Sequence, residues 1–127
     1  MSLFQWGNFT LHSGMQTWWR IDCDNLTNSE IHLLAKLIAE KVGTYHEVSC
    51  PESHPGSAVH GLKAALLQYR EPRYAGKKIM LLVDDVLTSG ATMQHIKDLN
   101  NKYYEYKGAV IFARGLCPDW VTPIFQM

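Results

Sequence analysis

The sequence has few cysteines, and none of them are paired at metal-binding spacing. Its three cysteines, Cys23, Cys50 and Cys117, lie far apart and are odd in number. Without a CxxC pair, the sequence indicates neither a structural zinc site nor a disulfide framework. We therefore expect reduced thiols and a cytoplasmic protein, because a reducing compartment keeps cysteines unpaired.

The sequence also lacks an excess of charge and a long apolar run. It contains 12 basic and 12 acidic residues, so its formal net charge is zero. A neutral chain gives no electrostatic reason to expect nucleic-acid binding. No apolar run approaches the length of a transmembrane helix, and no secretion signal is recognisable, so we expect no membrane association.

The chain does have enough apolar residues for one packed core. It is 127 residues long, with 46% hydrophobic and 19% charged residues, which is typical of a globular protein. This length fits a single domain. We expect one domain over residues 1–127, with a small N-terminal β segment at 4–24 and an α/β core at 25–127.

The most informative stretch of the sequence runs from residue 79 to residue 92. Residues 79–83 are all apolar, which predicts a strand buried on both faces of a parallel sheet. Asp84 and Asp85 then fall at the carboxyl end of that strand, where open α/β sheets bind ligands. Residues 88–92 are small and mostly hydroxylic and precede a helical pattern, which predicts a site for a phosphate monoester. Two carboxylates beside a phosphate suit sugar hydroxyls or Mg²⁺.

This stretch resembles the ribose-phosphate-binding signature of the type I phosphoribosyltransferases. That signature is an apolar strand, two acidic residues, an apolar pair and then Thr-(Thr/Ser)-Gly-(Ala/Gly)-(Thr/Ser). Residues 83–92 read VDDVLTSGAT, with every position in class. The resemblance implies that the 5-phosphate of a ribose is held by Thr88, Ser89, Gly90, Ala91 and Thr92. An ordinary strand–turn–helix with an Asp-rich turn is the alternative.

The N-terminal segment resembles the hood of the orotate phosphoribosyltransferases. Its alternating pattern predicts two short strands joined by a turn at residues 13–15. The positions that match the hood are Phe9, Leu11, Ser13, Gly14, Thr17, Trp19 and Asp22. His12 stands at a position where that family often has a lysine. Because of this difference, the acceptor that we expect is either an orotate-like base or another nitrogenous base. Trp19 is our candidate for stacking on this base, and packing in the core is the alternative.

Helical and strand patterns alternate along the rest of the chain. The expected elements are a helix at 25–43, a strand at 45–50, a helix at about 58–69, the strand at 79–83, a helix at 90–104 and a strand at 109–113. Such alternation predicts an α/β fold, a parallel sheet with flanking helices. Combined with the resemblance, it implies a minimal type I phosphoribosyltransferase fold with an N-terminal β hood.

Residues 51–57 are predicted to form a loop between a strand and the start of a helix, which is a geometry that binds anions. In the family that this sequence resembles, the equivalent loop binds pyrophosphate. The resemblance therefore implies pyrophosphate contacts by Ser53, His54, Gly56 and Ser57, and an ordinary connection is the alternative. Residues 70–78 are short and basic where orotate-type relatives carry a long mobile loop.

The last expected strand is followed by residues 114–120, on the side of the sheet where ligands bind. Many phosphoribosyltransferases have an aromatic residue near this point that packs on the nucleobase. By resemblance, Trp120 and Arg114 are our candidates for base binding. Packing of Trp120 on the core with Val121 and Ile124 is the alternative.

The resemblance implies a phosphoribosyltransferase that uses 5-phosphoribosyl 1-pyrophosphate, Mg²⁺ and a nitrogenous base. Asp84 and Asp85 are the expected catalytic and metal-binding residues. We also expect a homodimer. Because the 70–78 segment is short, the alternative is a non-catalytic module that senses phosphoribosyl pyrophosphate or a nucleotide.

Overall fold

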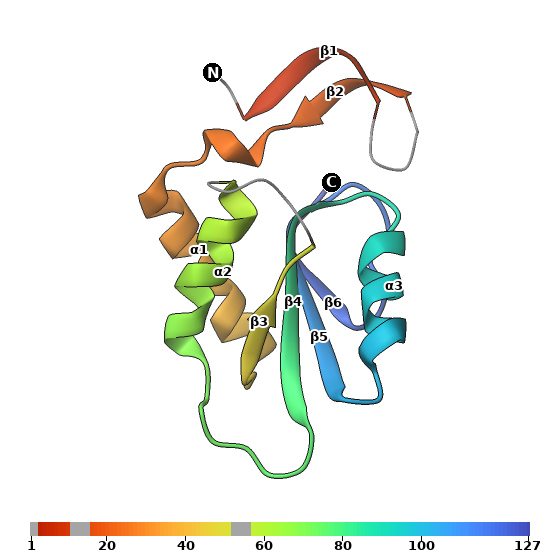
Figure 1. Cartoon of the computed structure of the whole chain (residues 1–127). Coiled ribbons are helices and arrows are strands. Elements are labelled where there is room, and N and C mark those ends of the chain that lie inside the picture. The colour runs from red at the N-terminus through yellow and green to blue at the C-terminus, as the bar shows by residue number, and fades with distance from the viewer. Residues whose placement is uncertain (1–2, 11–15, 52–56) are drawn as a thin grey trace.

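The computed structural model describes residues 3–10, 16–51 and 57–127. In this part of the chain an antiparallel hairpin precedes an α/β core (Figure 1). The hairpin consists of β1 (Phe4–Thr10) and β2 (Gln16–Ile21), and it lies where the hood was expected. A 3-10 turn, η1 (Cys23–Asn25), leads from the hairpin toward the core. No helix of the described residues is long and apolar enough to cross a membrane.

The core is built on a parallel sheet with the strand order β3-β4-β5-β6. Its strands are β3 (Glu47–Ser49), β4 (Lys78–Leu87), β5 (Tyr104–Ala113) and β6 (Val121–Gln126). Because every pairing is parallel, the carboxyl ends of the strands meet at one edge of the sheet. The hairpin lies over this edge in Figure 1.

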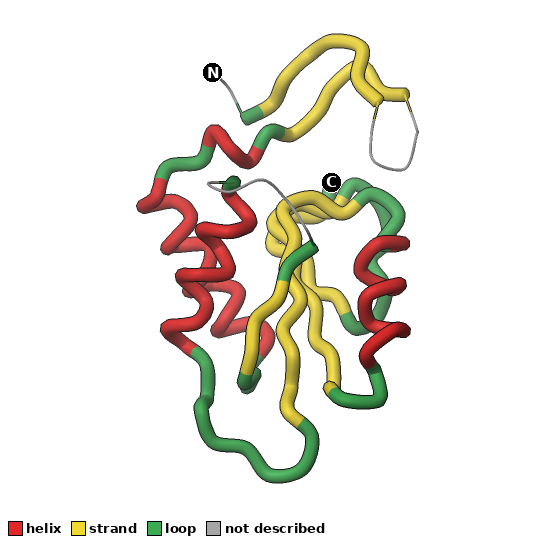
Figure 2. Tube along the Cα trace, viewed as in Figure 1, coloured by secondary structure: helices red, strands yellow, loops and turns green. Residues whose placement is uncertain are grey.

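Helices cover both faces of the sheet (Figure 2). One face carries α1 (Asn28–Val42) and α2 (Ala58–Leu66), which continues into the 3-10 turn η2 (Leu67–Tyr69). The other face carries α3 (Ala91–Asn100). The expected α/β architecture is therefore confirmed.

The first helix shows how the sequence sets these elements. Thr27 caps α1: its Oγ1 accepts from the Glu30 N–H at 3.2 Å, and Glu30 Oε1 accepts from the Thr27 N–H at 2.9 Å. The chain leaves the helix at Gly43, whose φ of +74° favours glycine. One apolar stripe on α1 is buried, formed by Ile31, Leu34, Ala35 and Ile38.

Strand β4 is the centre of the core. Leu81, Leu82 and Val83 have no exposed surface. Leu81 and Val83 pack with the α1 and α2 residues, whereas Leu82 packs with Met93 of α3. Successive side chains of β4 therefore pack on opposite faces of the sheet, as the all-apolar run predicted.

The strands extend further than the sequence pattern indicated. Strand β4 continues to Leu87 and therefore includes the two aspartates, and β5 begins at Tyr104, where a helix was expected. The pattern also missed β6. Its sequence, VTPIFQ, contains Pro123, which argues against a strand unless the strand lies at the edge of a sheet. The edge position of β6 makes the proline acceptable, and only the tertiary structure shows that position.

Candidate functional site

Asp84 and Asp85 lie on β4, near the carboxyl edge of the sheet. Asp84 pairs with Val110 of β5, and β4 ends three residues after Asp84, at Leu87. Both aspartates are half-buried. The buried strand before them fixes their backbone, so their carboxylates are presented from a rigid element.

The two carboxyl groups are anchored to the backbone of β4 itself. Oδ1 of Asp84 accepts from the Asp85 N–H at 2.8 Å, and Oδ1 of Asp85 accepts from the Val86 N–H at 2.8 Å. Neither side chain forms an ion pair with another described residue. The pair is therefore not neutralised by a protein cation in this part of the chain.

Burial raises the pKa of Asp84 to about 8, and the hydrogen bond and charge of Asp85 add to the effect. Two adjacent carboxyl groups resist full ionisation when no cation balances them. At neutral pH the pair therefore favours a shared proton or a bound cation. Both states suit contacts with sugar hydroxyls, which donate to and accept from carboxyl groups.

The donor set of this pair is compatible with magnesium. Within the described residues, no group of three or more His, Cys, Asp or Glu side chains is arranged to hold a metal ion. Magnesium requires fewer protein ligands, because it usually takes one or two carboxylates together with water and substrate oxygens. Asp84 and Asp85 supply such a set of hard oxygen ligands, and a phosphorylated ligand would complete it.

The segment after β4 forms an open turn at the start of α3. Gly90 is the N-cap residue, and its φ of +77° favours glycine. Ser89 Oγ accepts from the Ala91 N–H at 3.3 Å. Ser89, Ala91 and Thr92 are exposed, and Thr88 is half-buried. The N-terminus of α3 thus faces solvent directly after the two aspartates, as the phosphate-site prediction requires.

The loop after β5 lies against this turn. The Arg114 N–H donates to the Leu87 carbonyl at 2.8 Å. A Cβ built on Gly115 would lie 3.1 Å from the Thr88 carbonyl oxygen, so only glycine leaves this approach relaxed. Arg114 is therefore placed beside the end of β4, near the candidate site. Its contact with a base stays a prediction.

Trp120 packs between the sheet and α3. Its indole Nε1–H donates to Gln94 Oε1 at 2.9 Å, and its ring meets Tyr106 edge-on at 6.5 Å. A Cβ on Gly108 would lie 2.9 Å from Trp120 Cζ3, so the ring lies against the middle of β5. Trp120 packs in the same cluster as Val121, as the packing alternative expected, whereas Ile124 packs in the other core cluster. These contacts place Trp120 below the carboxyl edge, and its base-binding role stays a prediction without a described contact.

Several predicted contact residues lie outside the described part of the chain. Ser53, His54 and Gly56 are among these residues, and the side chain of Trp19 is also not described. Ser57 is described: it is 5% exposed, and it is the N-cap of α2 without a side-chain capping bond. The pyrophosphate assignment therefore stays a prediction.

The basic linker at residues 70–77 lies at the opposite edge of the sheet. It enters β4 at its amino end, far from the aspartates (Figure 1). Lys78 Nζ lies 3.2 Å from Glu47 Oε1, and Lys77 Nζ donates to the Asn101 carbonyl at 3.0 Å. These cations stabilise the amino-terminal edge and do not replace a mobile loop over the site.

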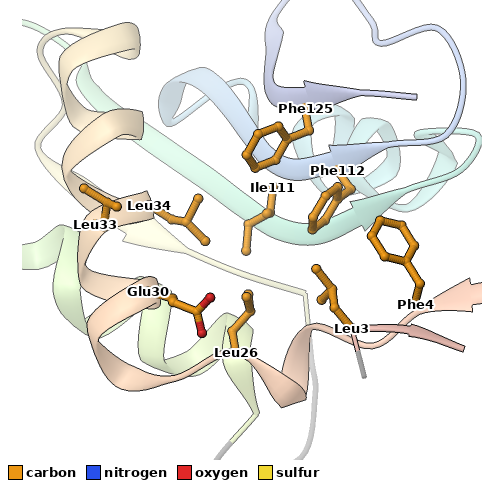
Figure 3. A pocket seen from close by; sticks show the side chains of 9 residues that line it. All are labelled: Leu3, Phe4, Leu26, Glu30, Leu33, Leu34, Ile111, Phe112 and Phe125. Carbon is orange, nitrogen blue, oxygen red and sulfur yellow. The ribbon is translucent and has the colours of Figure 1, made fainter. Parts of the chain in front are cut away.

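An apolar pocket of about 400 Å³ lies beside the hairpin (Figure 3). Its lining residues come from the start of β1, from α1 and the segment before it, and from β5 and β6: Leu3, Phe4, Leu26, Glu30, Leu33, Leu34, Ile111, Phe112 and Phe125. Its charged residue, Glu30, already caps α1 through Thr27. The pocket includes neither the aspartates nor the α3 turn, so it is separate from the candidate site.

Sequence reasoning did not indicate that the turn η1 brings further acidic residues close to β4. The charges of Asp85, Asp22, Asp24 and Asp84 all raise the pKa of the Cys23 thiol, in addition to the larger effect of its burial. The acidic residues that flank Cys23 therefore lie near the β4 aspartates. Their Asp-Cys-Asp pattern is visible in the sequence, but its position at the N-terminus of α2 depends on the path of the chain after β2.

No model of a known protein family matches the sequence, and no curated protein sequence matches it either. Solved structures, in contrast, match nearly the whole chain in fold.

The UMP synthase of Leishmania donovani has a TM-score of 0.74 at 16% identity over 98% of this chain. The match covers 34% of that protein, so this chain spans about a third of its length. The orotate phosphoribosyltransferase of Aeropyrum pernix has a TM-score of 0.73 at 17% identity, covering 98% of this chain and 88% of that one. The Mycobacterium tuberculosis enzyme of the same name has a TM-score of 0.65 at 14% identity, covering 98% and 89%.

At these identities the similarity establishes the fold and leaves the activity open. The shared architecture is the parallel sheet with its flanking helices. The chain has the fold of the type I phosphoribosyltransferases, in a short form.

Proposed function

We propose that the carboxyl edge of the sheet binds a 5-phosphoribosyl group and transfers it from 5-phosphoribosyl 1-pyrophosphate to a nitrogenous base. The observation that carries the proposal is the solvent-open turn at residues 88–92, which follows Asp84 and Asp85 after the last two residues of β4. The type I phosphoribosyltransferase fold supports the general activity.

The turn is suited to the 5-phosphate. The first backbone N–H groups of a helix lack partners within the helix, and its dipole places positive charge at this end. The exposed hydroxyl groups of Ser89 and Thr92 add donors on the same turn. A phosphate monoester would therefore be held by Thr88, Ser89, Gly90, Ala91 and Thr92.

The aspartates are suited to the ribose. Their carboxyl groups would accept hydrogen bonds from two neighbouring hydroxyls, either directly or beside Mg²⁺ held by Asp84 and Asp85. When bound, the magnesium would supply positive charge that stabilises the departing pyrophosphate. The carboxylates would stabilise the oxocarbenium character that develops at C1 of the ribose.

The acceptor base would attack C1 as pyrophosphate leaves. The protein would need to orient the base and exclude water, and no covalent intermediate with the protein is required. Trp19, Trp120 and Arg114 stay the predicted base contacts. The acceptor base, a homodimer and a cytoplasmic location also stay predictions.

The second candidate function is a non-catalytic module that binds phosphoribosyl pyrophosphate or a nucleotide. The observation that favours it is the position of the basic linker at residues 70–77, at the edge opposite the site. Closure of a charged loop excludes water and completes many active sites. Within the described residues, that linker supplies no such closure.

One experiment distinguishes the two functions. The protein is incubated with isotope-labelled 5-phosphoribosyl 1-pyrophosphate, Mg²⁺ and a panel of pyrimidine and purine bases. Release of pyrophosphate that depends on one base supports the transferase, whereas binding of the donor without turnover supports the sensor. Absence of both binding and turnover would contradict the proposal that this edge is a phosphoribosyl site.

A further inference from the structure

The loop after β5 supports the candidate phosphate turn from one side. This loop spans residues 114–120, and we call it the β5–β6 loop. A Cβ built on Gly115 would lie 3.1 Å from the Thr88 carbonyl oxygen, and a Cβ built on Gly90 would lie 3.3 Å from the Pro118 ring. The loop and the turn are therefore so close at residues 88 and 90 that neither approach leaves room for a further methyl group.

The end of β6 holds the β5–β6 loop in place. It reaches the carboxyl edge of the sheet (Figure 1), where Gln126 pairs with Ala113. Gln126 Nε2 donates to the Gly115 carbonyl at 2.8 Å and to the Ala113 carbonyl at 3.4 Å. The Met127 N–H also donates to the Ala113 carbonyl, at 2.8 Å. The side-chain amide of Gln126 thus joins the last strand of the sheet to the loop residue that approaches Thr88.

The hydrogen bond from Gln126 to Gly115 matters more for position than for stability. The Gln126 side chain is exposed, and an exposed amide exchanges a water partner for a protein partner with little net gain in free energy. The bond does fix the distance between Gly115 and the backbone of β6. Because closely packed groups transmit displacements, a shift of Gly115 moves Thr88, the first residue of the turn.

We propose that Gln126 is a positioning residue for the phosphate turn at residues 88–92. Its amide holds the β5–β6 loop against Thr88 and Gly90, and this support keeps the start of α3 in the shape that a phosphate monoester requires. The proposal rests on the proposed function for the identity of that ligand. Energetic coupling is reciprocal, so a phosphate bound at the turn also stabilises the contact between the loop and Gln126.

The test uses the full chain, with ribose 5-phosphate titrated by calorimetry and the free protein observed by ¹⁵N NMR. Gln126→Met removes the amide donors and keeps a side chain of similar length without a charge. Ile124→Val is the matched control on the same strand. Ile124 packs against the core cluster that contains Leu34 and Ile111. Its truncation costs stability but removes no hydrogen bond, because the side chain is apolar.

We expect Gln126→Met to weaken ribose 5-phosphate binding by about threefold to tenfold, the range that corresponds to one lost hydrogen bond. Ile124→Val should change this affinity by less than about twofold, although it lowers the thermal stability at least as much as Gln126→Met does. In the free protein, the backbone amide signals of Thr88 and Gly90 move in Gln126→Met and stay in place in Ile124→Val.

Unchanged ribose 5-phosphate affinity in Gln126→Met overturns the inference. An equal loss of affinity in Ile124→Val also overturns it, because the loss would then follow the stability of β6 and not the position of the loop. Failure of the wild-type protein to bind ribose 5-phosphate contradicts the proposed function instead. The NMR spectra of the free protein then decide the role of Gln126: amide signals of Thr88 and Gly90 that stay in place in Gln126→Met overturn it, and signals that move support it.

Discussion

Gly90 and Pro118 lie in contact at the carboxyl edge of the sheet: a Cβ built on Gly90 would lie 3.3 Å from two carbons of the Pro118 ring. Gly90 also has a φ of +77°. A residue with a side chain pays about 1–2 kcal/mol in this conformation. Both restrictions fall on the residue that turns the chain from β4 into α3, so the shape of the candidate phosphate turn depends on glycine.

Gly90→Ala is therefore expected to weaken ribose 5-phosphate binding by about tenfold or more, because the turn must shift to relieve strain and contact. Gly76→Ala is the matched control. Gly76 has a φ of +79° with no atom within 4 Å of a built Cβ, and it lies in the linker at the opposite edge. Both variants lose about 1 kcal/mol of unfolding free energy, but only Gly90→Ala loses affinity in calorimetry. Equal affinities of the two variants for ribose 5-phosphate would show that the phosphate does not bind at the Gly90 turn.

The double variant Asp84→Asn with Asp85→Asn is expected to abolish Mg²⁺-dependent binding of 5-phosphoribosyl 1-pyrophosphate. Asparagine keeps the shape and an acceptor oxygen for the backbone bonds of β4, so the fold should persist. It removes the charge that magnesium requires. Calorimetry measures binding and circular dichroism measures folding. Retained Mg²⁺-dependent binding in the folded double variant would refute the placement of the ribose.

The contribution of Asp84 to the stability of the metal-free protein is expected to fall as the pH rises from about 4 to about 8. Burial raises the pKa of Asp84 from 3.8 to about 8, so the folded state binds this proton more tightly than the unfolded state does. This stabilisation is complete at pH values below the unfolded-state pKa of 3.8. It is lost as the pH rises through the folded-state pKa of about 8. Asp84→Asn should remove about 1–3 kcal/mol of this loss of unfolding free energy. The figure is reduced from the full pKa difference because solvent screens a half-buried group. Urea unfolding of the wild type and of Asp84→Asn at several pH values measures the free energy of unfolding. The same change of this free energy with pH in both proteins would contradict the prediction.

Trp120→Phe is expected to act on stability. The variant loses the hydrogen bond to Gln94 and part of the ring that contacts Gly108. We expect a loss of about 1–3 kcal/mol in unfolding free energy. If Trp120 only packs internally, as its described contacts do, binding of any acceptor base stays within about twofold. A large loss of base affinity at unchanged stability would support the stacking role instead.

The best predicted parts of the protein are those with local signals. The all-apolar run before Asp84 predicted a strand buried on both faces, and Leu81 and Val83 are fully buried. The apolar spacing predicted a helix at 25–43, and α1 spans Asn28–Val42. The small, glycine-containing stretch at 88–92 predicted a turn before a helix, and Gly90 is the N-cap residue of α3.

The less well predicted parts depend on contacts between distant segments. Strand β6 forms because β5 offers it a partner, and its proline is tolerated only at the sheet edge. The linker at residues 70–77 resembled a shortened active-site loop in composition, but its connection to the amino end of β4 places it away from the site. The sequence pattern alone does not indicate at which edge of the sheet a loop lies.

The sequence by itself determined the parallel α/β core and the turn that follows Asp85, because buried strands, glycine turns and helix starts have local physical causes. The tertiary structure alone decided that η1 lies at the N-terminus of α2 and that Asp24 caps this helix, across a sequence separation of 34 residues. The reason is that hydrogen bonds and charges act through space. Residues that are polar loop positions in the sequence become partners only when the chain brings them together.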